Sequence, residues 1–239
     1  MAARSASKGA RAIVSCPLLA LRAGINGLSC MMRNVLIITC CCLTMLAGCT
    51  DLHHEEAEHL NQEGVQYLAS NNLPKAHDKF VQAWKQEPQN AETLYNLAST
   101  YQRHDQNTEA ERYYRQALQV NPNFTACRHN YYLLLVSQNR LPEARDDAQR
   151  WLAQNPKSAD AYVQVGWLMR AQGDLPNARK NLEEALALEP HNTEALLESG
   201  KLYQDFHMFD RAKTLYQRVL MVDPYNKDAQ AMLTSMPKK

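Results

Sequence analysis

Residues 91–124 read AETLYNLASTYQRHDQNTEAERYYRQALQVNPNF, and the pattern of this segment recurs before and after it. A proline returns every 34 residues near the end of each copy: Pro88, Pro122, Pro156, Pro190 and Pro224. An alanine precedes each of these prolines by twelve residues: Ala76, Ala110, Ala144, Ala178 and Ala212. An unbroken period of this length indicates one supersecondary unit copied five times, and the copies must stack because a single unit cannot bury its own apolar face.

Small and large apolar residues alternate in register when the copies are taken as 57–90, 91–124, 125–158, 159–192 and 193–226. Position 8 is small in four copies (Gly64, Ala98, Gly166 and Gly200), and position 24 is large in the same four (Phe80, Tyr114, Leu182 and Tyr216). This order resembles the tetratricopeptide repeat, a helical hairpin whose two helices cross closely at small residues. The resemblance implies an all-α fold, a right-handed α-solenoid of five 34-residue hairpins. Residues 227–239 are predicted to hold a C-terminal capping helix, over residues 227–235, and a short tail.

Each copy is predicted to form helix A over its positions 2–14 and helix B over its positions 18–30. Helix B should begin at Pro74, Pro142 and Pro176, because a proline in the first turn of a helix forfeits no hydrogen bond. The preceding turns carry residues that tolerate a left-handed backbone: Asn71, Asp105, Asn139 and Gly173.

The third copy exchanges large and small residues relative to the others. Tyr132 stands at position 8, Ala148 at position 24 and Trp151 at position 27, where the other copies have Ala or Val. The summed core volume is roughly kept, and cores tolerate such exchanges. We interpret this copy as a repacked repeat, with Trp151 filling the space that Ala148 vacates.

A second informative segment is Leu46-Ala47-Gly48-Cys49. A basic start at residues 31–33, an apolar run at residues 35–45 and small residues before a cysteine follow the order of a secretory signal. The last four residues resemble the lipobox of bacterial lipoproteins, which implies that residues 31–48 are removed and that Cys49 carries a diacylglycerol anchor. The alternative is an ordinary membrane anchor, but residues 34–48 are fewer than the roughly 20 that a spanning helix needs.

Residues 1–30 do not fit the start of such a signal, because a signal peptide begins close to its apolar run. One explanation is that translation starts at Met31 or Met32 instead of Met1. The other is an unusually long basic leader. Residues 49–56 would then be a lipidated tether, and Thr50, rather than an aspartate, follows the cysteine. By the enterobacterial sorting pattern we expect the periplasmic face of the outer membrane rather than the inner membrane.

The charge of the mature chain disfavours several classes of partner. All 25 acidic residues but only 21 of the 26 basic ones follow residue 48, which gives a mature net charge of −4. A slightly acidic body is not typical of a nucleic-acid binder. It also lacks a basic patch that could hold an anionic membrane, so the lipid on Cys49 is the expected membrane contact.

Sites for chemistry are sparse. The segment His53–His59 is rich in potential metal ligands, but His54 and His59 are five residues apart and diverge on a helix, so a solvated helix start is the favoured interpretation. Cys127 is expected to be a packed side chain rather than a nucleophile. No phosphate-binding loop or nucleophile elbow is present in the sequence. We therefore predict a non-enzymatic protein with no cofactor, no metal and no small-molecule substrate.

The repeat family usually binds an extended peptide or a partner helix in a concave groove lined by helices A. Carried over by repeat position, this resemblance places eight residues in the groove: Tyr95, Asn96, Arg103, His129, Asn130, Trp167, Arg170 and Lys201. Tyr95 and Trp167 could instead pack against the next helix A. A carboxylate clamp of the chaperone-binding type is disfavoured, because its cationic positions hold Tyr95, Ala126 and Asn130 here.

Together these features predict a lipid-anchored scaffold that binds a protein or peptide partner. It is similar in plan to outer-membrane repeat lipoproteins of the type IV pilus pilotin and barrel-assembly types, which indicates an assembly factor for an envelope complex. The alternative is an auxiliary subunit of a polysaccharide-export or cell-wall enzyme complex.

Overall fold

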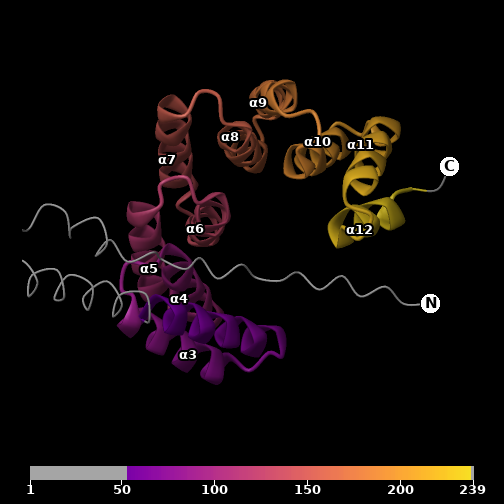
Figure 1. Cartoon of the computed structure of the whole chain (residues 1–239). Helices are drawn as coiled ribbons and strands as arrows, with labels where there is room; N and C mark the ends of the chain where they lie inside the picture. The colour runs from indigo at the N-terminus through magenta and orange to yellow at the C-terminus, as the bar shows by residue number, and fades with distance from the viewer. Residues whose placement is uncertain (1–52, 238–239) are drawn as a thin grey trace, which may run out of the picture. The chain divides into compact units, whose positions relative to one another are not determined.

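The computed structural model describes residues 53–237, and within that range every regular element is an α-helix (Figure 1). Residues from Glu56 onward form one compact unit. A helix over residues 53–69 comes first and is followed by α3 (Leu73–Gln86), α4 (Ala91–Arg103), α5 (Asn107–Val120), α6 (Thr125–Ser137), α7 (Leu141–Gln154), α8 (Ala159–Gln172), α9 (Leu175–Leu188), α10 (Thr193–Asp205), α11 (Phe209–Val222) and α12 (Lys227–Ser235).

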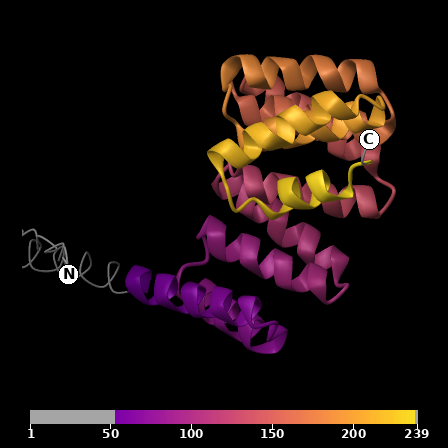
Figure 2. The same cartoon turned by 90° about the vertical axis from the view of Figure 1, so that its right-hand side faces the viewer.

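The predicted fold class is confirmed: the chain is an all-α solenoid of helical hairpins. Helix 53–69 pairs with α3, where Gly64 lies against Phe80 and Glu63 pairs with Lys79. The pairs α4–α5, α6–α7, α8–α9 and α10–α11 follow, with α12 packed on α11. Figure 1 shows α6, α8 and α10 on the inner side of this stack, and α7, α9 and α11 on the outer side. Figure 2 shows the same unit after a quarter turn, with the first hairpin in indigo and purple at the bottom of the view and α9 in orange at the top.

Most helices A begin one residue earlier than predicted, because the last residue of the preceding copy caps them. Side chains at that place accept a hydrogen bond from the third backbone N–H of α4, α8, α10 and α12; they belong to Asn90, Ser158, Asn192 and Asn226. The third repeat departs from this rule. Phe124 precedes α6 and contributes its ring to the core instead of a cap.

The turns between helices A and B have the predicted left-handed backbone. Asn71, Asp105 and Asn139 have φ of 56°, 58° and 60°, and Gly173 has φ of 87°. His207 occupies the same place in the fifth repeat with φ of 57°, which its residue type did not indicate.

Helices A and B cross so closely that glycine is required in three repeats. A Cβ atom added at Gly64 would lie 2.5 Å from Cε1 of Phe80, and one added at Gly200 would lie 2.4 Å from Cε1 of Tyr216. In the third repeat Tyr132 and Ala148 take these two places, and both are buried. The predicted exchange of large and small residues is therefore confirmed, since a large side chain on helix A replaces the large side chain that the other repeats have on helix B.

Trp151 requires a correction. It is only 4% exposed, but it does not belong to the core cluster that contains Tyr132 and Ala148, so it does not fill the space beside Ala148. The indole Nε1 of Trp151 donates to Oδ1 of Asn123 at 3.2 Å, and the guanidinium of Arg128 lies 4.6 Å from the indole ring centre. Trp151 thus covers the turn before α6 and stacks under a buried cation.

Candidate functional site

The helix-A face, formed by helix 53–69, α4, α6, α8 and α10, carries side chains that bond from one repeat to the next. In each of three pairs, position 5 of one repeat contacts position 6 of the following one, 35 residues later. The pairs are Asn96 Nδ2 donating to Asn61 Oδ1 (3.0 Å), Asn130 Nδ2 donating to the Tyr95 hydroxyl (2.9 Å) and His129 Nδ1 donating to Gln164 Oε1 (2.9 Å). We call this series the amide ladder. It fixes the orientation of polar groups along the face before any partner arrives.

The ladder changes the expected role of Asn96 and Asn130. Both side chains were predicted to line the groove, and the structure shows one N–H of each already donated to a neighbouring helix A. A primary amide has a second N–H and a carbonyl oxygen. Binding of a peptide would therefore use only part of each amide.

A hollow of about 440 Å³ lies on this face and is lined from four helices A. Its walls are Tyr95 of α4, Thr125, Ala126, His129 and Asn130 of α6, Asp160 of α8 and Glu194 of α10. The ladder ends at this hollow, because Gln164 donates from Nε2 to Oε1 of Glu194 at 2.8 Å. A chain of three polar side chains thus connects α6, α8 and α10.

The acceptor of its hydrogen bond shows which ring nitrogen of His129 carries a proton in this series of side chains. An amide oxygen can only accept, so Nδ1 of His129 carries a proton where it meets Gln164. The same Nδ1 lies 3.8 Å from Oε1 of Glu194. Burial raises the pKa of the Glu194 carboxyl and nearby Asp160 raises it further, while His129 acts in the opposite direction.

Asp160 is bound by neutral groups only. Its Oδ2 accepts from the Thr125 hydroxyl at 2.8 Å, and its Oδ1 accepts from Nδ2 of Asn192 at 3.2 Å. Among residues 53–237, no lysine or arginine forms an ion pair with Asp160 or Glu194. The hollow therefore carries two carboxylates without a cationic counter-charge.

Two predicted groove cations, Arg170 and Lys201, are held by carboxylates of the protein itself. Glu198 is 5% exposed and lies 3.2 Å from Nη2 of Arg170 and 2.7 Å from Nζ of Lys201. Arg170 also contacts Asp205 at 3.1 Å. Because a buried carboxylate needs such partners, these cations satisfy Glu198 and are not open charges on the face. Arg103, by contrast, lies in the last turn of α4 and is exposed.

Trp167 also departs from expectation. It was placed in the groove, with packing against another helix A as the alternative, and it is 8% exposed and belongs to the hydrophobic core with Leu168. Its ring centre lies 5.0 Å from that of His129, so the residue packs against the preceding helix A. Tyr95 is half-buried. Its ring centre lies 5.2 Å from that of Phe124, and its hydroxyl takes part in the amide ladder by accepting from Asn130. The large apolar side chains that stay exposed on this face are Val65 and Leu133, both at position 9.

Sequence comparison identifies the family. Three sequence profiles of the tetratricopeptide repeat match residues 91–124, 132–192 and 169–236. The chain is a tetratricopeptide-repeat protein. Over 117 residues it is 29% identical to the photosystem I assembly protein Ycf3 of Synechococcus sp. (strain CC9605). That match spans 46% of this chain and 66% of the relative.

Solved tetratricopeptide-repeat structures share the fold. A thermophilic protein of Thermus thermophilus is 24% identical, with a TM-score of 0.62 over 75% of this chain and 97% of that one. PilW, described as a type IV pilus biogenesis factor, is 22% identical, with a TM-score of 0.55 over 74% of this chain and 82% of its own. Pseudomonas aeruginosa PilF is 20% identical, with a TM-score of 0.54 over 75% and 90%. At these identities the likeness establishes the fold alone.

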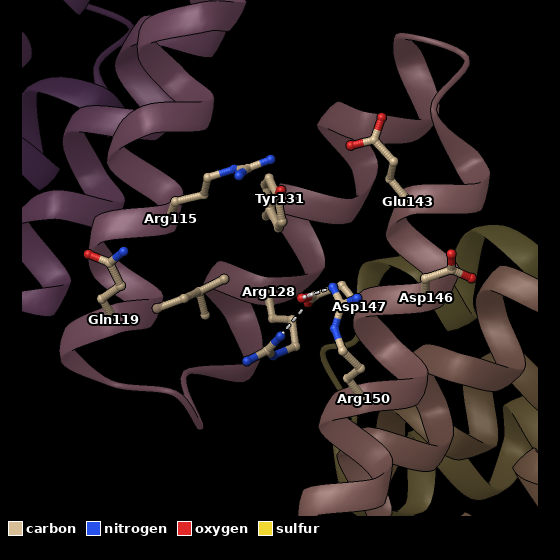
Figure 3. A pocket seen from close by; sticks show the side chains of 9 residues that line it. Arg115, Gln119, Arg128, Tyr131, Glu143, Asp146, Asp147 and Arg150 are labelled. Atoms are coloured by element: carbon tan, nitrogen blue, oxygen red, sulfur yellow. Dashed lines mark hydrogen bonds and ion pairs between the residues drawn. The ribbon is translucent and has the colours of Figure 1, made fainter.

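The outer side of this tetratricopeptide-repeat protein carries a second hollow, of about 430 Å³, between α5, α6 and α7 (Figure 3). Figure 3 shows Arg128 paired with Asp147, with Arg115 and Gln119 on one side and Glu143, Asp146 and Arg150 on the other. Arginines and carboxylates occur here in equal number, and some pair with one another, as in the 3.3 Å contact of Arg150 with Asp147. The formal charges that line this hollow therefore cancel. In the sequence, the hollow could have been suspected from Arg128, because the other repeats have Leu or Tyr at this position.

The remaining predicted sites give little evidence of chemistry. Among the described residues, no three or more His, Cys, Asp or Glu side chains are grouped to hold a metal ion. Cys127 is buried, its thiol donates to the carbonyl of Tyr114 at 3.6 Å, and burial raises its pKa to about 12, so it is a packed thiol rather than a nucleophile. Cys49, the predicted lipidation site, lies outside the described residues. Within the described part of the chain, no helix combines the length and apolarity needed to cross a bilayer.

Proposed function

We propose that this chain is a lipid-anchored scaffold that binds a protein or peptide partner on its helix-A face and assists assembly of an envelope complex. The observation that carries the proposal is the amide ladder leading to the hollow at Tyr95, His129 and Glu194. A row of oriented amides beside a hollow suits an extended peptide, because a peptide offers a donor and an acceptor at every residue. The exposed Leu133, 40% accessible on the same face, supplies an apolar contact.

Assembly is the role that the names of the relatives support. The Ycf3 relatives are named for photosystem I assembly, and PilW is described as a pilus biogenesis factor. We carry over only the class of role, since the match to Ycf3 spans 66% of its length and the PilW likeness concerns the fold. A non-enzymatic role is typical of repeat proteins, in which stacked helices form an extended binding surface.

The anchor is the part of this proposal that depends on sequence. Cys49 in the segment Leu46–Cys49 would carry the lipid, and residues 49–56, of which 53–56 form the start of helix 53–69, would tether the repeats to the periplasmic face of the outer membrane. A single attached lipid group gives weak membrane binding, whereas several acyl chains on one residue give a stable anchor. With so short a tether, the repeats and any bound partner would stay near the bilayer.

Site-specific photocrosslinking tests the binding face. A photoreactive amino acid is placed at Leu133 on α6, and a matched control is placed at Glu184, an exposed residue of the outer helix α9. Irradiation of intact cells should join one partner to the Leu133 variant and leave the Glu184 variant unmodified. Equal products from both positions, or none from Leu133, would contradict binding on the helix-A face.

A further inference from the structure

The carboxylates on the helix-A face are neutralised unequally. Glu198 and Asp205 have Arg170 and Lys201 beside them, whereas Asp160 and Glu194 have neutral hydrogen-bond donors and the imidazole of His129 but, among the described residues, no lysine or arginine in an ion pair with them. Both of these uncompensated carboxylates line the same hollow. A partly enclosed pair of like charges is unfavourable until a cation joins it.

The shape of the hollow follows from one small residue. Position 2 of helix A is acidic in four repeats, at Glu58, Glu92, Asp160 and Glu194, and is Ala126 in the third. A methyl group in place of a carboxylate leaves room in front of α6, and the side chains of Tyr95, Asn130 and Glu194 border that room. Acidic residues near helix starts are also favoured by the helix dipole, but that effect does not account for a hollow at Ala126.

On the basis of the proposed function, we infer that this hollow binds a lysine or arginine side chain of the partner peptide. Asp160 and Glu194 supply the negative charge, the Tyr95 ring offers a face for the aliphatic stem or the cation, and the amide ladder holds the peptide backbone alongside. A volume of about 440 Å³ is large enough for a long side chain and part of its backbone. An acidic peptide is disfavoured, because no lysine or arginine is among the described residues that line the hollow.

A peptide-library experiment tests this inference with the full-length protein in detergent. The probe is a degenerate peptide library, acetylated and amidated at its ends, from which retained peptides are sequenced. Wild type should enrich Lys or Arg at one position by about tenfold over Gln. The enrichment should disappear in Glu194→Gln and Asp160→Asn, two changes that remove charge while keeping hydrogen-bond acceptors.

Glu92→Gln is the matched control, because Glu92 has the same repeat position on α4 but does not line the hollow. It should bind the enriched peptides within about twofold of wild type, and helical melting curves of all variants should show that they are folded. Retained peptides without a basic preference, or equal losses in Glu194→Gln and Glu92→Gln, would overturn the inference and leave the proposed function standing. A library from which wild type retains nothing would contradict both.

Discussion

Nη1 of Arg128 lies 2.6 Å from Oδ2 of Asp147, and this ion pair joins α6 to α7 at the one repeat where a tyrosine replaces the small residue of the helix crossing. Arg128 is 7% exposed, and its guanidinium also donates to the carbonyl of Pro122 at 2.8 Å and stacks on Trp151. The Tyr132 hydroxyl donates to the same Asp147 oxygen at 2.8 Å. In the third repeat, an ion pair and a hydrogen bond therefore join α6 to α7 in addition to the apolar contacts.

The first prediction concerns this pair. Asp147→Ala should lower the free energy of unfolding by about 3 kcal/mol, because it leaves a buried guanidinium without its carboxylate. Adding Arg128→Leu to that variant should restore at least half of the loss, since leucine is the residue of repeats one, two and five at this place. Urea titration of the two single variants and the double variant measures the coupling. Additive losses would show that the pair does not act as a unit.

The second prediction concerns the close helix crossing. Gly200→Ala should cost about 1–3 kcal/mol of stability, because its Cβ would lie 2.4 Å from the ring of Tyr216. Ala98 holds the same place in the second repeat, so Ala98→Gly is the control and should cost no more than about 1 kcal/mol. Thermal melting followed by circular dichroism compares the two. A Gly200→Ala protein with the same melting temperature as wild type would show that the two helices can move apart at no cost in stability.

The third prediction separates core from surface on the helix-A face. Trp167→Ala should cost about 3–5 kcal/mol, the usual range for a buried tryptophan. Leu133→Ser, at the same repeat position on α6, should change stability by less than about 1 kcal/mol and weaken partner capture. Melting curves and the yield of partner in an affinity pull-down, measured on the same preparations, give both effects. Loss of partner in proportion to loss of stability in the Leu133 variant would argue against a contact role.

The fourth prediction uses the raised pKa of Glu194. As pH rises, the unfolded chain releases this proton in the ordinary range for glutamate, near pH 4.5, and the folded protein releases it only at higher pH. The carboxyl therefore lowers stability increasingly through that window, and the full loss is present above the raised pKa. Glu194→Gln should melt higher than wild type near neutral pH, with the difference vanishing at about pH 3.

The groups that face Glu194 are His129 on α6, Asp160 on α8 and Glu198 on its own helix. His129 opposes the shift and Asp160 adds to it, so Asp160→Asn should reduce the pH dependence of wild type. A Glu194→Gln protein that melts lower at neutral pH would show that the carboxylate stabilises the fold.

The fifth prediction concerns the anchor. Cys49→Ser should leave an unprocessed precursor and release the repeats from membranes, because only a thiol can form the thioether to diacylglycerol. Intact mass of the wild-type protein should correspond to a chain beginning at Cys49 plus its acyl groups. A mature protein that begins at Met1 or Met31 and carries no lipid would contradict the proposed anchor.

Periodicity in the sequence sufficed to predict the helices, since a period of 34 residues with fixed prolines leaves little freedom in the fold. It did not predict which side chains of the helix-A face are open. Trp167 is covered because His129 of the preceding repeat lies over it, and Arg170 is neutralised by Glu198 and Asp205. Such contacts depend on how neighbouring helices are placed relative to one another, and the repeat positions in the sequence do not specify that placement. The Arg128 pair was missed for the same reason, although an arginine at a leucine position was visible.

The hydrophobic core of the solenoid is divided along its length. It consists of three clusters, and the partly buried Met169 joins the first to the second, while Leu186 joins the second to the third. Because each repeat is stabilised mainly by its neighbours, such narrow joints are where cooperativity weakens. Under denaturant we therefore expect the repeats on the two sides of such a joint to unfold in separate steps.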